Sequence, residues 1–203
     1  MWDDGPVKVI ASPTRLPAVP PKRAALPRSN ERSGRWSVDD TGARKAWSHE
    51  RSQTGKYEWL TPPEIIHALG RFDLDPCAPI HRPWPTADFH YTVLDDGLTQ
   101  PRFGRVWLNP PYGPHTHKWL ARLAAHGNGI ALTFARTETR MFFAWVWGKA
   151  VAVLFLRGRL TFYNADGTKP GNSGGAPSCL VAYGSSNVET LARSRLDGKL
   201  IRL

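Results

Sequence analysis

The sequence Asn-Pro-Pro-Tyr at residues 109–112 combines residue types that can hold a planar amino group. An Asn side-chain oxygen accepts a hydrogen bond and carries no charge. Proline has a fixed φ and no N–H, so Pro110 and Pro111 form a stiff step whose carbonyls can be aimed outward. The Asn109 oxygen and the Pro110 carbonyl could accept both hydrogens of one exocyclic –NH₂, while Tyr112 stacks on its ring. The alternative is a proline-rich turn with a core tyrosine, since short motifs also arise by chance.

Acidic residues follow two short apolar segments upstream of this stretch. Asp75 ends a predicted strand over 72–75, and Asp95 and Asp96 follow a predicted strand over 91–94. In α/β sheets ligands bind at the carboxyl ends of strands, and an acid about 20 residues after the first strand turn grips ribose hydroxyls. Asp95 lies 20 positions after Asp75. The pattern predicts a nucleoside-binding site, with an ordinary Asp-Gly turn as the alternative for Asp95 and Asp96.

The elements that must position these residues alternate between helical and extended patterns from residue 57 onward. Predicted helices span 62–69, with Thr61 as the cap, 115–125 and 138–147; predicted strands span 72–75, 91–94, 105–108, 129–134, 151–156, 160–163 and 178–183. Such an order predicts an α/β fold with a parallel-centred sheet, whose last two strands form an antiparallel edge. Asp75, Asp95, Asp96 and Asn109 then all fall at strand ends.

Charge and cysteine content limit the function classes. The chain has 203 residues and a formal net charge of +10, which favours a polyanionic partner, most simply nucleic acid. Two cysteines, Cys77 and Cys179, make neither a disulfide framework nor a four-cysteine zinc site, and they fit a reducing cytosolic location. The sequence shows no run of about 18 apolar residues for a membrane span, and its first residues do not read as a signal peptide.

Composition divides the chain near residue 56. Residues 1–56 are rich in proline and carry 11 Lys or Arg against 6 Asp or Glu, half of the net positive charge. They read as a flexible, partly disordered basic arm that could follow phosphates, or equally as a solvated tail. Residues 57–203 hold the periodic patterns and are predicted to form the second domain.

Several segments in a fixed order resemble the Dam-like DNA N6-adenine methyltransferases of phages and prophages, which use S-adenosylmethionine. The segments are Tyr-Glu-Trp-Leu-Thr-Pro-Pro at 57–63, Asp-Leu-Asp-Pro-Cys-Ala at 73–78, Asp-Gly-Leu at 96–98, Val-Trp-Leu-Asn-Pro-Pro-Tyr-Gly at 106–113, Ala-Arg-Thr at 135–137, Phe-Phe at 142–143, Gly-Arg-Leu-Thr-Phe at 158–162 and Pro-Ser at 177–178. The resemblance covers roughly 57–184 and excludes the arm. It implies a three-layer, Rossmann-like class I methyltransferase sheet.

The resemblance also implies an activity, a cofactor and a site. The activity is site-specific methyl transfer from S-adenosylmethionine to the N6 amino group of adenine, in double-stranded DNA with the base flipped out, in the cytoplasm of a bacterial host. The catalytic residues are Asn109, Pro110, Pro111 and Tyr112. The cofactor-binding residues are Thr61, Pro62, Asp75, Pro76, Cys77, Ala78 and either Asp95 or Asp96. Residues 79–81 follow as Pro-Ile-His, where related enzymes have Gly-x-Gly, so the cofactor-binding backbone must take another shape.

Other features of the sequence leave alternatives open. Arg136 and Arg159 are predicted to contact phosphate, or to cap strand ends. The spacing of the histidines matches no closed metal site, so no metal is expected. The Asn-Pro-Pro-Tyr chemistry also suits cytosine N4, an RNA base or a protein glutamine, and the missing glycines allow a nucleic-acid-binding protein without activity. The oligomeric state is open.

Overall fold

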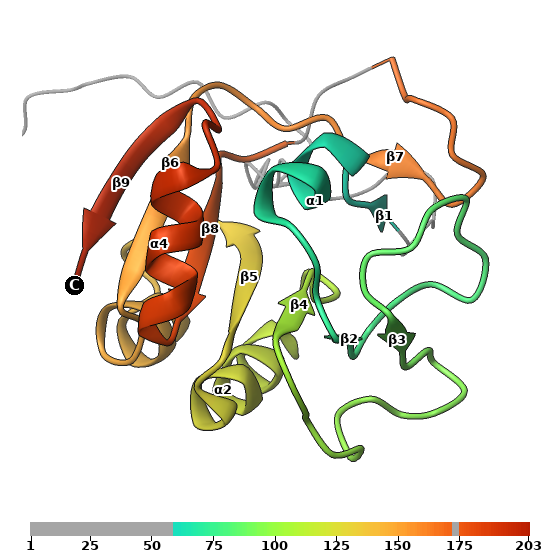
Figure 1. The fold of residues 1–203 in the computed structure, drawn as a ribbon, viewed down its shortest axis with the longest axis horizontal. Coiled ribbons are helices and arrows are strands. Elements are labelled where there is room, and N and C mark those ends of the chain that lie inside the picture. The colour runs from blue at the N-terminus through green and yellow to red at the C-terminus, as the bar shows by residue number, and fades with distance from the viewer. Residues whose placement is uncertain (1–58, 172–174) are drawn as a thin grey trace, which may run out of the picture. The chain divides into compact units, whose positions relative to one another are not determined.

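The computed structural model describes residues 59–171 and 175–203 (Figure 1). The predicted arm lies outside the described residues, so the domain boundary near residue 56 stays a prediction. The helices are α1 (Pro63–Leu69), α2 (Thr116–His126), α3 (Arg140–Phe142) with the π-helical turn η1 (Phe143–Trp147), and α4 (Ser185–Arg193). The strands are β1 (Trp59–Leu60), β2 (Leu74–Asp75), β3 (Phe89–His90), β4 (Val106–Leu108), β5 (Gly129–Phe134), β6 (Ala152–Leu156), β7 (Tyr163–Asn164), β8 (Ser178–Tyr183) and β9 (Gly198–Arg202).

Seven strands form one mixed sheet in the order β3-β2-β4-β5-β8-β6-β9. The strands from β3 to β5 are parallel, and β8 lies antiparallel between β5 and β6. After β2 the chain goes outward to β3, then returns to place β4 on the other side of β2. The strand order thus reverses between β2 and β4, the kind of point where α/β sheets bind ligands beyond their carboxyl ends.

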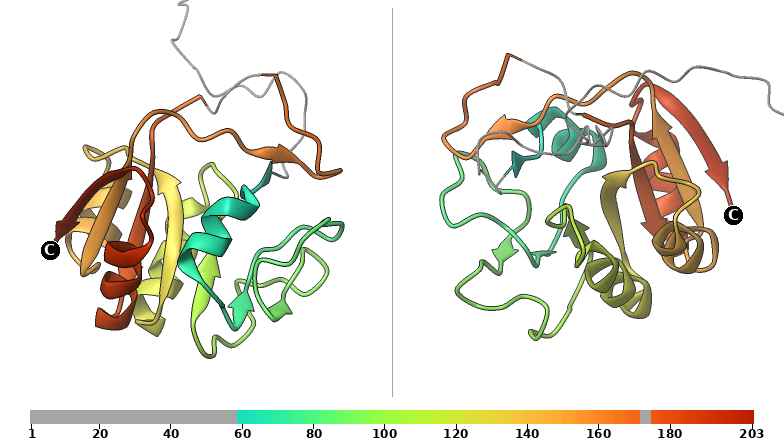
Figure 2. Two further views of the ribbon diagram at one scale, coloured as in Figure 1. Left: turned by 45° about the horizontal axis from the view of Figure 1, so that its top comes forward. Right: turned by 180° about the vertical axis from the view of Figure 1, so that it is seen from behind.

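Helices cover both faces of this sheet, so the fold has three layers (Figure 2). Strand β5 shows why, because its residues are buried on both faces: Ile130 and Leu132 pack toward α1 and α4, and Ala131 packs toward α2 and η1. A strand covered on both sides reads as a continuous apolar run rather than an alternating one. The predicted mixed α/β architecture is therefore observed, but the parallel strands occupy one half of the sheet, from β3 to β5, rather than its centre.

Four sequence-based assignments were wrong or incomplete. The segment 91–94 is not a strand: the preceding pair Phe89–His90 forms β3, and turns follow over 93–99. The strand expected at 160–163 is shifted to β7, which pairs with β1 in a separate two-stranded sheet. Strand β8 lies between β5 and β6 rather than at the edge of the sheet. The edge strand is β9, which follows α4, pairs with β6 and was not predicted from the sequence. Thr61 does not cap α1, whose cap position is Pro62.

Asn187 ties the two halves of the sheet together at the amino ends of β4 and β5. Its side chain is fully buried, accepts a hydrogen bond from Arg105 Nε (2.7 Å), and donates to Tyr183 O (2.8 Å) and Asn128 Oδ1 (3.0 Å). Arg105 also donates to the carbonyls of Leu69 and Arg71. One amide therefore links α4 to the segment that leads into β4 and to the end of β8.

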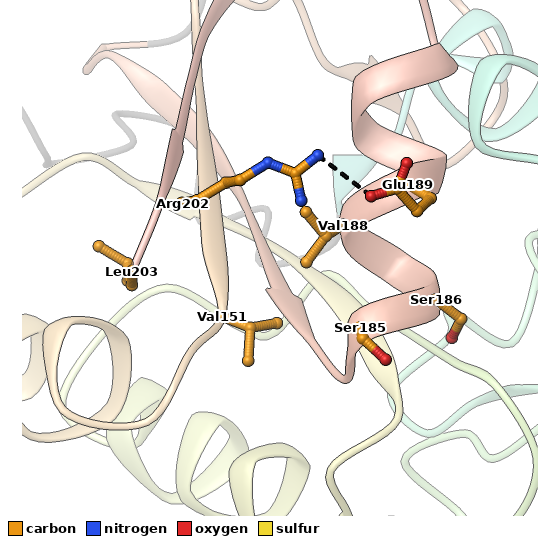
Figure 3. Close-up of a pocket in the computed structure, with 7 residues that line it drawn as sticks. All are labelled: Val151, Ser185, Ser186, Val188, Glu189, Arg202 and Leu203. Carbon is orange, nitrogen blue, oxygen red and sulfur yellow. Dashed lines mark hydrogen bonds and ion pairs between the residues drawn. The ribbon is translucent and has the colours of Figure 1, made fainter.

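A groove of about 480 Å³ opens at this same edge, between α4 and β9 (Figure 3). Val151 and Val188 form part of its floor, and an exposed ion pair between Arg202 and Glu189 (3.1 Å) crosses it. Because Arg202 pairs with Ala152, the first residue of β6, the groove lies at the opposite edge of the sheet from the end of β4.

We expect the substitution Asn187→Ala to lower the free energy of unfolding by about 2–3 kcal/mol, because it leaves buried polar partners unsatisfied. Urea denaturation of the full chain measures this difference. Ser186→Ala, one residue away and exposed, is the matched control and should change stability by less than about 0.5 kcal/mol. Equal effects of the two substitutions would contradict the role of the Asn187 amide.

Candidate active site

Asn109 follows the last residue of β4 and is engaged at both ends of its amide. Its Nδ2 donates to the carbonyl of Trp59 (3.2 Å), the first residue of β1. Its Oδ1 accepts a hydrogen bond from the hydroxyl of Tyr112 (3.3 Å). The backbone carbonyl of Asn109 accepts the thiol hydrogen of Cys77 (3.2 Å). The Asn109 side chain is thus oriented by its own loop and by β1.

Thr116, at the start of α2, braces the loop that carries Tyr112. Its buried hydroxyl donates to the carbonyl of Pro111 (2.8 Å) and accepts from the N–H of Gly113 (2.9 Å). Gly113 has a φ of +150°, in the region that favours glycine. The backbone on both sides of Tyr112 is therefore fixed by one side chain, which sequence patterns did not single out.

The ring of Tyr112 lies parallel to that of Phe134, the last residue of β5. Their centroids are 4.1 Å apart with an interplanar angle of 14°, and Phe162 meets the tyrosine edge-on at 6.1 Å. Burial raises the pKa of Tyr112 above its usual value, so the hydroxyl stays protonated and remains a donor to Asn109. Phe134 was not recognised as a site residue, although its place at the end of a predicted strand was the available signal.

Asp75 ends β2 and organises the loop that follows. Its side chain is buried, with Oδ1 accepting from the N–H of Cys77 (3.0 Å) and Oδ2 accepting from the hydroxyl of Thr86 (2.5 Å). Burial raises the pKa of Asp75 to about 6, while the two hydrogen bonds act in the opposite direction. Burial also raises the pKa of the Cys77 thiol well above its usual value. Cys77 is therefore a protonated donor that joins this loop to Asn109.

Asp95 and Asp96 lie in an exposed turn rather than at a strand end, because β3 stops at His90. Asp95 Oδ2 accepts from the N–H (2.7 Å) and the hydroxyl (2.9 Å) of Thr92, and these bonds lower the pKa of Asp95. Gly97 packs so closely on Pro76 that a Cβ there would lie 1.8 Å from the Pro76 carbonyl oxygen. The turn therefore rests directly on the loop after Asp75.

Thr61 and Pro62 lie between β1 and α1 and are both buried. The Thr61 carbonyl accepts from the indole N–H of Trp84 (3.1 Å), but the Thr61 hydroxyl has no partner within the described residues. A buried hydroxyl without a partner is uncommon and suits a site that receives a polar ligand. Segments 59–62, 75–78 and 109–112 thus meet at the carboxyl edge of the sheet.

Arg136 and Arg159 are exposed and follow the carboxyl ends of β5 and β6. Arg159 donates to the carbonyl of Gly175. Both arginines therefore lie at the edge of the sheet that carries Asn109. Ser178, which pairs with Phe134 across β5 and β8, is buried, and its hydroxyl has no partner within the described residues. It is a further residue that sequence reasoning did not assign.

Residues 59–171 and 175–203 hold no group of three or more His, Cys, Asp or Glu side chains that could bind a metal ion. None of the helices in that part of the chain is long and apolar enough to cross a membrane.

Comparison with protein families matches residues 48–194 to the family described as DNA N-6-adenine-methyltransferase (Dam). The match begins before and ends after the segment 57–184 in which the sequence resemblance was found. No curated protein and no solved structure matches the chain.

The raised pKa of Asp75 generates a prediction about stability and pH. The pKa of Asp75 is 3.8 in the unfolded chain and about 6 in the folded protein. At a pH between these two values, Asp75 carries a proton in the folded protein but not in the unfolded chain. The contribution of Asp75 is therefore fully present below about pH 4 and is lost as the pH rises through 6. Relative to Asp75→Asn, we expect the wild-type free energy of unfolding to fall by on the order of 3 kcal/mol between about pH 4 and 7.

Urea denaturation of both proteins across this range measures the effect. Burial lowers the pKa of the neighbouring His90 to about 4, so this group acts in the opposite direction. His90 is present in both proteins, and its effect cancels in the difference. A difference that does not vary with pH would contradict the assignment.

Proposed function

The chain belongs to the DNA N-6-adenine-methyltransferase (Dam) family, and from this premise we propose that it transfers a methyl group from S-adenosylmethionine to the N6 atom of adenine in DNA. The observation that carries the proposal is the junction at Asn109, where an amide acceptor on a braced loop meets the loop after Asp75. The reversal of strand order between β2 and β4 supports a Rossmann-like class I sheet, because both loops leave the sheet at that point.

Asn109 and Pro110 supply the chemistry on the side of the base. The lone pair of the adenine amino nitrogen is delocalised into the ring, which makes it a poor nucleophile. The Asn109 Oδ1 and the Pro110 carbonyl would accept its two hydrogens, and this favours a tetrahedral nitrogen whose lone pair is free. Because Thr116 and Trp59 hold the loop before the base arrives, the protein contributes mainly position and orientation.

The residues near Asp75 fit the expected cofactor. S-adenosylmethionine, when bound, supplies a methyl group that a positively charged sulfur makes electrophilic. The unpartnered buried hydroxyl of Thr61 offers a polar contact, and Pro62 lies next to it. Asp75 shapes the loop formed by Pro76, Cys77 and Ala78, since its oxygens bind Cys77 and Thr86.

Of the two acids in the turn, Asp96 is the better candidate to bind the ribose hydroxyls. A carboxylate can accept from two vicinal hydroxyls. One oxygen of Asp95 is engaged by Thr92 within the turn. The Asp96 side chain is exposed, and among the described residues it makes no hydrogen bond or ion pair; the next residue, Gly97, packs on Pro76 in the loop after Asp75.

DNA is the partner that the family and the charge support. The net charge of +10 favours a polyanion, and Arg136 and Arg159 lie at the carboxyl edge where they can reach phosphates. A base inside a duplex must be flipped out to reach Asn109, at a cost of a few kcal/mol that stacking on Tyr112 offsets in part. Double-stranded DNA and base flipping are therefore part of the proposal.

Asn109→Ala removes the side-chain acceptor, and we expect it to lower the rate of methyl transfer by about 10²–10³-fold, as loss of one preorganised polar group does in other enzymes. DNA from cells that express each protein is digested to nucleosides, and mass spectrometry measures N6-methyladenine against N4-methylcytosine. Urea denaturation provides the folding control, where loss of two hydrogen bonds should cost about 1–2 kcal/mol. The proposal would be contradicted if the wild type produced methylcytosine without methyladenine, or if the variant methylated DNA at the wild-type rate.

Asp96→Asn keeps the size of the side chain but removes its charge, and we expect about tenfold weaker binding of S-adenosylmethionine, the equivalent of one charged hydrogen bond. Isothermal titration calorimetry on the full chain measures the affinity. Asp95→Asn is the matched control, since its amide oxygen can still accept from Thr92, and it should bind the cofactor like the wild type. The absence of any cofactor binding by the wild type would instead favour a nucleic-acid-binding protein without activity.

A further inference from the structure

The stacked pair of Tyr112 and Phe134 lies at the carboxyl edge of the sheet, and both rings are half-buried. Phe134 ends β5, next to the strand that ends before Asn109. Phe162 is buried and closes the edge of the tyrosine ring. One face of each stacked ring is therefore covered by the other ring.

The Tyr112 hydroxyl also occupies the position that the amino group of the substrate would take in the proposed reaction. It donates to Asn109 Oδ1, the acceptor that the proposed chemistry needs for an amino hydrogen. The O···O distance of 3.3 Å is long for a hydroxyl donor, for which about 2.7–2.8 Å is usual. The bond is therefore weak and easily exchanged for an N–H donor of the substrate.

Ser178 provides a second, independent observation at the same place. It pairs with Phe134 across β5 and β8, so the two side chains leave the same face of the sheet. Its exposed fraction is 2 %, and its hydroxyl has no partner within the described residues. Buried hydroxyl groups normally have a hydrogen-bond partner, so the Ser178 hydroxyl, beside the aromatic pair, is available to a polar atom of a ligand.

We propose that Phe134 and Ser178 complete the pocket for the target base, whose purine ring enters between Tyr112 and Phe134 while the Ser178 hydroxyl donates to a ring nitrogen. The assignment rests on the proposed function and adds two residues to it. The base then stacks on two aromatic faces, and its amino group takes the place of the tyrosine hydroxyl on Asn109.

Entry of the base requires the two rings to separate. A planar ring between two others needs about 7 Å between them, two contacts of roughly 3.5 Å each, against the present 4.1 Å between centroids. Thr116 holds the backbone on both sides of Tyr112, so the tyrosine side chain moves while the loop stays in place. One contact between the two rings is exchanged for two contacts with the base.

The test uses the full chain and compares Phe134→Leu, which keeps apolar volume but has no ring, with Phe134→Trp, which keeps a stacking face. We expect Phe134→Leu to lower kcat/KM for DNA by about 10–100-fold and to leave the affinity for S-adenosylmethionine unchanged, while Phe134→Trp keeps most of the activity. Phe89→Leu is the control, because Phe89 is also half-exposed but belongs to β3 at the edge of the sheet.

A spectroscopic measurement separates stacking from a merely structural effect. 2-Aminopurine replaces an adenine that the wild type methylates, and its fluorescence should be more strongly quenched in the wild-type complex than with Phe134→Leu. Ser178→Ala should lower kcat/KM without lowering the free energy of unfolding, because it removes a hydroxyl that has no partner.

The outcomes distinguish the two proposals. No methyl transfer to adenine by the wild type would remove the proposed function and this pocket with it. With an active wild type, three results would each overturn the pocket alone: unchanged kcat/KM for Phe134→Leu, unchanged quenching, or an equal loss of cofactor affinity. A Ser178→Ala protein that unfolds more easily would show that its hydroxyl is structural and would exclude it from the pocket.

Discussion

The hydrogen bonds of Asn109 are the constraint on which the rest of the site depends. Its amide nitrogen binds the carbonyl of Trp59, its amide oxygen binds Tyr112, and its backbone carbonyl binds the thiol of Cys77. These partners come from β1, from the loop 109–112 itself and from the loop after β2. Three segments that are distant in sequence are thereby placed around one uncharged side chain, so a small displacement of any of them reorients the acceptor.

The sheet provides the frame for this junction. Strands β2 and β4 are neighbours whose carboxyl ends point the same way, yet the chain visits β3 between them. The loop after Asp75 and the loop after Leu108 therefore leave the sheet at the same edge, where the Cys77 thiol and the Asn109 carbonyl join them. At the amino edge, Asn187 joins α4 to Arg105 and to the end of β8 by hydrogen bonds. This network and the candidate site therefore lie at opposite edges of the sheet.

The sequence was sufficient for the strands with long apolar runs and for the rigid Asn-Pro-Pro-Tyr loop, because both are set by local chemistry. It failed at β3, which has only two residues and is held by its pairing with Leu74 and Asp75. It also failed for Phe134 and Ser178, since a single aromatic and a single serine carry no periodic signal. Their proximity depends on the antiparallel register of β5 and β8, a long-range pairing that no short motif encodes.

The hydrogen bonds within the loop after Asp75 limit the kind of ligand that this loop can bind. Loops that bind phosphate do so with free backbone N–H groups. In the loop after Asp75, prolines 76 and 79 have no N–H, Cys77 donates to Asp75, and Ala78 donates to the carbonyl of Tyr91. No donor of residues 76–79 remains for an anion. The loop therefore has no backbone donor for a phosphate, which agrees with the proposed cofactor S-adenosylmethionine, a nucleoside derivative that carries no phosphate.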